Sequence, residues 1–195
     1  MPTIVALPDS IITASALASA DEVSLYASGL AATQSFGTLS GTSTISSTTS
    51  LNVINITKFQ NDILTINGSA NDYFVFNISD TMSENKPMTL SGGVKASHIL
   101  FNFTGTSGNV FSTAGGGVLY GTYLATRGGE FAADNLTLTG ALINTGGNVQ
   151  YVSGADTTFA GFTVVTTPVP EPESYGMMLG GLGLLGFMVR RKKNK

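Results

Sequence analysis

The chain has 195 residues, no cysteine and a formal net charge of −3 at pH 7. This length allows one domain of about 160 residues before a short C-terminal segment. Without cysteine, neither a disulfide framework nor a thiolate metal site can form, so core packing and backbone hydrogen bonds must hold the fold.

The charges are distributed unevenly along the chain. Five of the nine Lys and Arg residues lie in the last six positions, so residues 1–189 hold four cations against all twelve acids, a net charge of −8. An acidic body excludes nucleic acid as a partner, because nucleic acid requires a basic surface. The body is also rich in Ser, Thr, Asn and Gly, which is typical of an extracellular β protein with hydroxyls and amides on its outward faces.

Residues 1–50 are predicted to comprise a helix and a Ser/Thr-rich connection. Ser19 and Glu22 form a capping-box pattern, with Ser19 as the N-cap. We therefore expect a helix over residues 14–32. Its apolar face would be formed by residues at i, i+3, i+4 and i+7, namely Val23, Tyr26, Ala27 and Leu30.

The N-terminus lacks the pattern of an export signal. A signal peptide begins with a basic region and an unbroken apolar run, but residues 1–20 contain no Lys or Arg, and Pro8-Asp9 interrupts the apolar run. Ala18-Ser-Ala20 mimics a cleavage site, although the helix competes for the same residues. We hypothesise that the chain is a fragment or that its start codon is misplaced, and an in-frame stop codon directly before Met1 would remove this hypothesis.

A β domain is predicted over residues 51–167. Residues 33–50 are read either as a loop or as a thin first coil. Beyond them, apolar segments bounded by Asn, Asp and Gly indicate strands at 51–56, 63–66, 73–78, 88–90 and 98–103. The continuous apolar runs 73–76 and 99–101 favour strands that are covered on both faces.

A repeat appears in the second half of the domain. Gly121, Gly140 and Gly161 each open an apolar segment, at offsets of 19 and 21 residues. Short strands that recur about every 20 residues, with Gly and Asn at the corners, are typical of a β-solenoid. We therefore predict a mainly β fold, an irregular β-solenoid with one N-terminal helix, and a β-sandwich is the alternative.

The C-terminal segment has three parts. Two prolines with acidic neighbours predict an extended linker at 168–174. An uncharged run follows and predicts a single transmembrane helix at about 175–190, with the anchor residues Tyr175, Gly176, Leu179, Gly180, Gly183, Leu185, Phe187 and Val189. A helix of this length rises roughly 22 Å against a hydrocarbon core of about 30 Å, so it is a marginal anchor. Cations end the chain as a basic stop on the cytoplasmic side: Arg190, Arg191, Lys192, Lys193 and Lys195.

This C-terminal segment, residues 169–195, resembles the PEP-CTERM sorting signal of Gram-negative bacteria, which is also called the ice-binding protein C-terminal domain. The sorting motif is Val169, Pro170, Glu171 and Pro172. The resemblance implies export and transient anchoring in the inner membrane. It also implies recognition by the membrane protease exosortase, removal of the tail, and delivery of the body to the cell surface or the extracellular matrix.

The body resembles the choice-of-anchor A domain over residues 14–165. The segments that carry this resemblance are 51–56, 99–103, 121–125 and 138–143. It implies a body that is combined with alternative surface anchors, and more distantly a β-solenoid of the ice-binding type with a helix packed along the coil. It implies no catalytic residues.

The residues that could carry chemistry are few. His98 is the only histidine, and no Gly-x-Ser-x-Gly motif accompanies it, so we expect an ordinary hydrogen-bonding role. The G-x-G-x-x-G match at 181–186 lies inside the tail helix and fails as a dinucleotide site. Carboxylates for a glycosidase pair or a weak Ca²⁺ site are Asp62, Asp72, Asp80, Glu84, Glu130, Asp134 and Asp156. Because Asp is favoured in turns, we expect surface acids, no enzyme, no cofactor and no metal.

Five Asn-x-Ser/Thr sequons occur at Asn55, Asn67, Asn77, Asn102 and Asn135. Either they reflect composition alone, or these asparagines stack as ladders. We expect the body to be a non-catalytic interaction or adhesin-like module that contacts exopolysaccharide or other matrix glycans. Ice binding is the alternative and would require regularly spaced threonines, which the equivalent positions Thr122, Ala141 and Phe162 do not provide. A glycan-active enzyme is the third hypothesis.

Overall fold

The computed structural model describes residues 14–163 except 107, 114, 116 and 153. The chain divides into two units, residues 1–164 and 165–195, and the description concerns the first. Its elements are α1 (Ala14–Gly29), β1 (Gln34–Ser46), β2 (Leu51–Asn67), β3 (Tyr73–Ile78), β4 (Met82–Ser83), β5 (Thr89–Ser91), η1 (Ala96–His98), β6 (Ile99–Phe103), β7 (Asn109–Thr113), β8 (Gly117–Ala125), β9 (Glu130–Ala133), β10 (Leu136–Asn144), β11 (Val149–Tyr151) and β12 (Asp156–Phe159).

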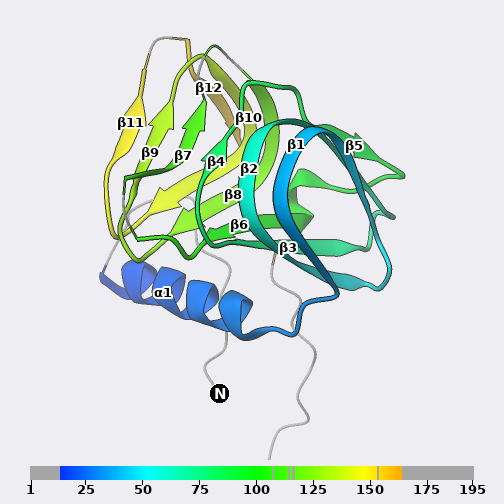
Figure 1. Ribbon diagram of the computed structural model, residues 1–195. Coiled ribbons are helices and arrows are strands. Elements are labelled where there is room, and N and C mark those ends of the chain that lie inside the picture. Colours follow the sequence, from blue (N-terminus) through cyan, green and yellow to red (C-terminus); the bar gives the residue numbers. More distant parts are fainter. Residues whose placement is uncertain (1–13, 107, 114, 116, 153, 164–195) are drawn as a thin grey trace, which may run out of the picture. The chain divides into compact units, whose positions relative to one another are not determined.

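The strands form a β-solenoid with α1 running along one side (Figure 1). All of the strand pairs in the described residues are parallel. Parallel pairing of sequential strands is what stacked coils produce, whereas a sandwich of hairpins would be antiparallel. The predicted mainly β solenoid with an N-terminal helix is therefore confirmed, and the β-sandwich alternative is wrong.

Each coil contributes to three faces. The helix face joins β3 and β6 with the first part of β1 and β2 and the last part of β8 and β10. The second face joins β4, β7, β9 and β11 with the middle of β2. The hydroxyl face joins β5 and β12 with the last part of β1 and β2 and the first part of β8 and β10. Met88 N donates to Val118 O at 2.8 Å, which places β5 beside β8.

Aromatic side chains stack through the interior of the coil. Phe76, Phe101 and Tyr123 occupy one register row on consecutive strands. Their ring centroids lie 4.7 Å apart in both steps, which matches the spacing of neighbouring strands. The predicted two-sided burial of 73–76 and 99–101 follows from this arrangement, since their inward residues fill the core and their outward residues face α1.

The helix packs mainly through small residues, and the predicted apolar face is buried only in part, at Ala27 and Val23. Ala20 and Ala27 contact the outward side chains of Val75, Leu100 and Leu124. Tyr26 was predicted to lie on the buried face, but 57% of it is exposed. Small side chains allow the helix backbone to approach the sheet closely, which explains why alanine and serine lie on the contact face.

The start of the helix agrees with the prediction, whereas its N-cap and its end do not. The helix begins at Ala14, so Ser19 lies inside it and is not the N-cap. It ends at Gly29 rather than at residue 32, and Leu30 N donates to Ala27 O in the final turn.

Two segments that were predicted as separate strands form a single strand. Segments 51–56 and 63–66 belong to the 17-residue β2, which passes through a corner at Asn61. The φ of Asn61 is 52°, a left-handed value that asparagine tolerates. Residues 33–50, read as a loop or a thin coil, contain the 13-residue β1, which confirms the second reading. The Asn and Asp that indicated a turn therefore mark a corner of the solenoid.

Two of the three glycine repeats are equivalent. Gly121 and Gly140 pair directly between β8 and β10. Gly161 is not their counterpart, because β12 aligns Phe159 with Gly140, and Gly161 lies beyond the strand. The last coil is two residues shorter than the sequence offset indicates, so Phe162 is not equivalent to Thr122 and Ala141.

Candidate functional site

The hydroxyl face presents threonines in register on successive coils. Thr44, Thr65 and the β5 residue Thr89 are aligned by strand pairing. On the later coils Thr139 aligns with Tyr120 and with Thr158. Alternation along each strand points these side chains outward, while their neighbours Ile45, Leu64, Ile66 and Leu138 fill the core.

A second row of polar side chains forms a hydrogen-bond chain. Ser91 Oγ donates to Asn67 Oδ1 at 2.9 Å, and Asn67 Nδ2 donates to Ser46 Oγ at 3.5 Å. These residues occupy the same register position on β1, β2 and β5. The sequon asparagine Asn67 is thus part of a polar row on this face.

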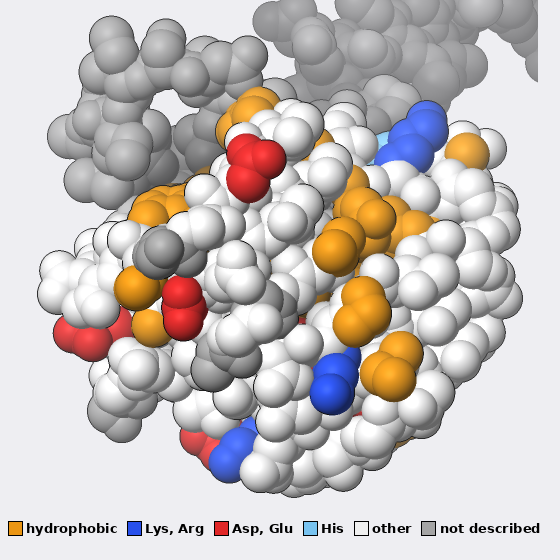
Figure 2. Space-filling model, turned by 90° about the horizontal axis from the view of Figure 1, so that it is seen from above, with side chains coloured by type: hydrophobic (Ala, Val, Ile, Leu, Met, Phe, Trp, Pro, Cys, Tyr) orange, Lys and Arg blue, Asp and Glu red, His pale blue; other side chains and the backbone are white. Residues whose placement is uncertain are grey.

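Apolar groups interrupt the hydroxyls, and charge is sparse. Ile63 and Val118 are 40% and 39% exposed on this face, and Tyr120 is half-buried between threonines. Asp156 is the acid that aligns with Thr137 at the C-terminal coil. Figure 2 shows that other parts of the surface share this character, with scattered charged side chains and a line of hydrophobic ones in a mostly uncharged polar field. Such a face can make many hydrogen bonds and several apolar contacts.

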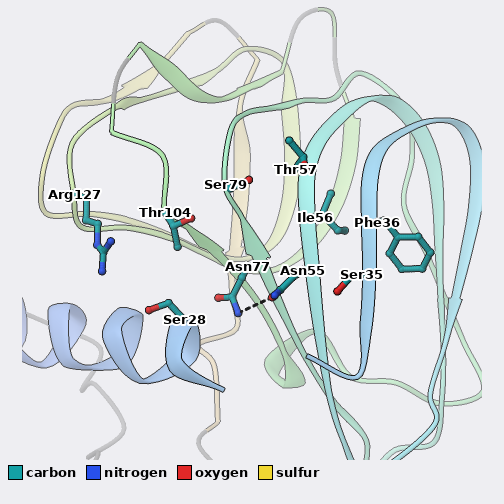
Figure 3. Close-up of a pocket in the computed structure, with 10 residues that line it drawn as sticks. All are labelled: Ser28, Ser35, Phe36, Asn55, Ile56, Thr57, Asn77, Ser79, Thr104 and Arg127. Carbon is teal, nitrogen blue, oxygen red and sulfur yellow. Dashed lines mark hydrogen bonds between the residues drawn. The ribbon is translucent and has the colours of Figure 1, made fainter. Parts of the chain in front are cut away.

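An open groove of about 490 Å³ lies beside the C-terminal end of α1 (Figure 3). Ser28 of the helix lies on one side of the groove, and Ser35 and Phe36 of β1 lie on the other. Arg127 is the cation among the lining residues, and none of them is an acid. The groove can hold a polar group, but it contains no carboxylate pair of the kind that a glycosidase uses.

An asparagine ladder forms part of the groove and extends under the helix. Asn55, Asn77 and Asn102 are in register on β2, β3 and β6. Asn77 Nδ2 lies 3.3 Å from Asn55 Oδ1 and 2.9 Å from Ala27 O. The ladder reading is therefore confirmed for these three sequons, while Asn135 adopts a left-handed turn conformation with φ of 51°.

Two of the acids that were predicted to lie on the surface are buried inside the solenoid, so the prediction is wrong for them. Asp62 and Glu84 are 1% and 2% exposed. Glu84 accepts hydrogen bonds from the backbone N–H groups of Asp62 at 3.0 Å and Lys86 at 2.7 Å, whereas neither carboxylate oxygen of Asp62 has a hydrogen-bond partner. Burial raises the pKa of Glu84, the backbone hydrogen bonds from Lys86 and Asp62 oppose this increase, and the Coulombic effect of the Asp62 side chain adds to it.

The remaining acids and His98 have local roles. Asp72 accepts from Ser69 N at 2.7 Å in a turn, which lowers the pKa of Asp72. His98 ends η1 and stacks on Tyr73 with ring centroids 4.0 Å apart. Burial lowers the pKa of His98, and a hydrogen bond to the backbone of Asp72 opposes this effect. Within the described part of the chain, no three His, Cys, Asp or Glu side chains are grouped as metal ligands.

The sequence-predicted sorting motif, anchor residues and basic stop (residues 169–195) lie outside the described residues. Within the described residues, no helix is both long and apolar enough to cross a bilayer. The hydroxyl face was missed because 33–50 was not assigned to a strand. The signal that could have revealed it is the alternation of Thr in Thr42-Ser-Thr44 and Thr137-Leu-Thr139.

Comparison with known proteins addresses the tail directly. Residues 168–192 match the PEP-CTERM protein-sorting motif. The chain therefore carries this motif at its C-terminus, which implies export, processing by exosortase and sorting to the surface. No curated protein matches the sequence.

The body is similar in fold to solved ice-binding proteins. One structure, of an ice-binding protein (LeIBP) from Arctic yeast with antifreeze activity, superposes with a TM-score of 0.59 at 21% identity and covers 80% of this chain. A glycosylated form of the protein gives a TM-score of 0.56 at 21% identity and 80% coverage. The chain spans 65% and 64% of the two proteins. At this identity the likeness establishes the β-solenoid fold alone.

Proposed function

We propose that the body is a non-catalytic interaction module that binds polysaccharide through the hydroxyl face. The observation that carries this proposal is the register of outward Thr and Ser side chains across β1, β2, β5, β10 and β12. Sugar rings present hydroxyls at their edges and C–H groups on their faces. The threonines match the former, and Tyr120, Ile63 and Val118 offer apolar contact to the latter.

The charge of the body favours a neutral polysaccharide. Residues 1–189 carry a net charge of −8, and the hydroxyl face contributes no cation to offset an acidic polymer. Like charges reduce both encounter rate and affinity. The ligand class is therefore a neutral, hydroxyl-rich chain of the extracellular matrix rather than a uronic acid polymer.

The sorting motif supports delivery of the body to a location where such a ligand occurs. After export, the tail helix would hold the protein transiently in the inner membrane, and exosortase would remove the tail and release the body to the cell surface or the matrix. Neither step requires chemistry in the body, and adhesion to matrix material gives it a role there.

Ice binding is a second candidate, favoured by one observation that the sequence did not reveal. Thr44, Thr65 and Thr89 form a regular row on a fold that ice-binding proteins share. Strands about 4.8 Å apart, with outward residues about 6.7 Å apart along each strand, would place hydroxyls in a two-dimensional lattice. Tyr120 interrupts this lattice in line with Thr139, so the polysaccharide proposal is preferred.

The test is retention of the protein by microcrystalline cellulose, a neutral polysaccharide, with alginate beads as the acidic comparison. We expect retention on cellulose that is lost in the double variant T65K/T139K. The matched control is Q60K/Q150K, at the ends of an outward row on the second face. Equal retention of both variants, or release of reducing sugar from the cellulose, would overturn the proposal, and thermal hysteresis in the wild type would support the ice-binding candidate instead.

A further inference from the structure

The solenoid ends in unpaired strand edges within the described residues. At the N-terminal end, β1 pairs with β2 alone. At the C-terminal end, β11 pairs with β9 alone and β12 with β10 alone. An unpaired edge presents a row of free N–H and C=O groups, which is a template for another strand.

Within residues 14–163, these edges lack the usual protection. Proteins block an exposed edge with lysine, proline, a bulge or a covering segment. Residues 34–46 of β1 contain no charged residue and no proline. A single bulge lies between Leu39 and Gly41, and the pairing of β1 with β2 continues on both sides of it. On β11 and β12, Asp156 is the one charged side chain.

The rows of the hydrophobic core continue to both ends of the stack. Phe36 aligns with the buried Ile56 and is 37% exposed. At the other end, Tyr151 aligns with the buried Ala133 and is 52% exposed. Thr157 aligns with the buried Leu138, and Phe159, two residues later on the same side of β12, is 59% exposed. Terminal repeats of soluble solenoids carry a polar outer face, whereas these ends carry aromatic residues.

The described residues that follow β12, residues 160–163, do not cover the last coil. Thr163 N donates to Ser97 O at 2.7 Å, and the ring of Phe162 lies 6.3 Å from that of Tyr73. The chain therefore turns back along the side of earlier coils. Another parallel coil of the same cross-section, placed on this end, would continue the core rows and the backbone hydrogen-bond ladders.

We propose that β11 and β12 of one copy pair with β1 of a second copy, so that the protein assembles head to tail. The first coil of this chain has the required direction, length and uncharged edge. The contact is heterologous, because it joins two different surfaces, and it leaves one free end of each kind. The assembly is therefore an open filament of stacked solenoids rather than a closed dimer.

The test uses the full chain in a mild non-ionic detergent that keeps the apolar tail dispersed. Sedimentation velocity should show a mass that rises with protein concentration beyond that of a dimer. Phe36→Lys blocks the N-terminal edge, and the pair Y151K/F159K blocks the C-terminal edge. Each blocked variant alone should be monomeric, and an equimolar mixture of the two should stop at a dimer, because one open edge of each kind remains.

The control is Leu25→Lys, which introduces the same charge at a residue of α1 that is 65% exposed and should leave assembly unchanged. Hydrogen exchange on the wild type gives a readout that needs no variant: protection at 34–46 and 149–159 should increase with concentration. A wild type that stays monomeric at all concentrations would overturn the proposal and indicate that the chain's own terminal segments cover the edges. Association that persists equally in the blocked variants would also overturn it and assign association to the tail.

Discussion

Asn102 Nδ2 donates to Asn77 Oδ1 at 2.9 Å, and this pair connects the helix to the sheet. Ser24 Oγ on α1 donates to Asn102 Oδ1 at 2.7 Å, and Asn77 Nδ2 donates to Ala27 O near the end of the same helix. The amides thus replace water for helix groups that burial against the sheet would otherwise leave unsatisfied. The position of α1 along the coil depends on this ladder.

Truncation of Asn102 should be costly. Asn102 is fully buried, so N102A removes the acceptor of Ser24 Oγ and the donor to Asn77 Oδ1. We expect the free energy of unfolding to fall by about 2–3 kcal/mol, measured by urea denaturation. The control is N55A, at the exposed end of the ladder, which should cost less than about 1 kcal/mol. Equal losses in the two variants would show that the ladder does not hold the helix.

Gly140 should not tolerate a side chain. A Cβ at Gly140 would overlap the backbone oxygen of Gly121 on the neighbouring strand, so the two coils would have to separate at this corner. G140A should lower the free energy of unfolding by about 2–4 kcal/mol. Gly37 on β1 has open space around the same position, so G37A should change stability by less than about 1 kcal/mol. A G140A melting temperature equal to that of G37A contradicts the packing.

The buried pair of Asp62 and Glu84 should make stability depend on pH. Because the pKa of Glu84 is raised in the fold, its contribution to stability is present below the ordinary carboxyl range and is lost as the pH rises through the raised value. D62N replaces a buried carboxyl group whose oxygens lack partners and removes its Coulombic effect on Glu84, so it should stabilise the protein at neutral pH by about 1–3 kcal/mol.

The measurement is the difference in melting temperature between D62N and the wild type, from about pH 4 to pH 8. This difference should grow as the pH rises. The control is D80N, which changes an exposed acid and should give a small, flat difference. A D62N variant that is less stable than the wild type at neutral pH would indicate that Asp62 has a partner, such as a bound cation.

Sequence patterns predicted the class of the fold well where side chains repeat by coil. The Gly121 and Gly140 pair and the apolar runs of β3 and β6 reflect stacking directly, because one residue type must fill one row. Patterns failed where packing overrides local preference. The helix buries Ala20 and Ser24 beside the predicted Ala27, and hydrophobic periodicity does not select the first two. Asn61 turns a corner within a strand instead of ending it.

The candidate site was less predictable than the fold. Whether Thr44 and Thr89 lie in one row depends on the register of β1, β2 and β5, and residues 45 positions apart carry no signal of this alignment in a single sequence. The sorting motif, in contrast, could be identified because its parts are contiguous in the chain, and residues 168–192 match it.

The hydroxyl face is the central claim about the body, and the most direct measurement is binding to suspended microcrystalline cellulose by co-sedimentation, comparing the wild type with T65K/T139K and Q60K/Q150K. We predict that wild type and Q60K/Q150K sediment with the polysaccharide alike, while T65K/T139K binds at least about tenfold more weakly, because two buried ammonium groups would have to be desolvated at the contact. If all three proteins remain in the supernatant, or all three bind equally, the hydroxyl face is not a polysaccharide-binding surface.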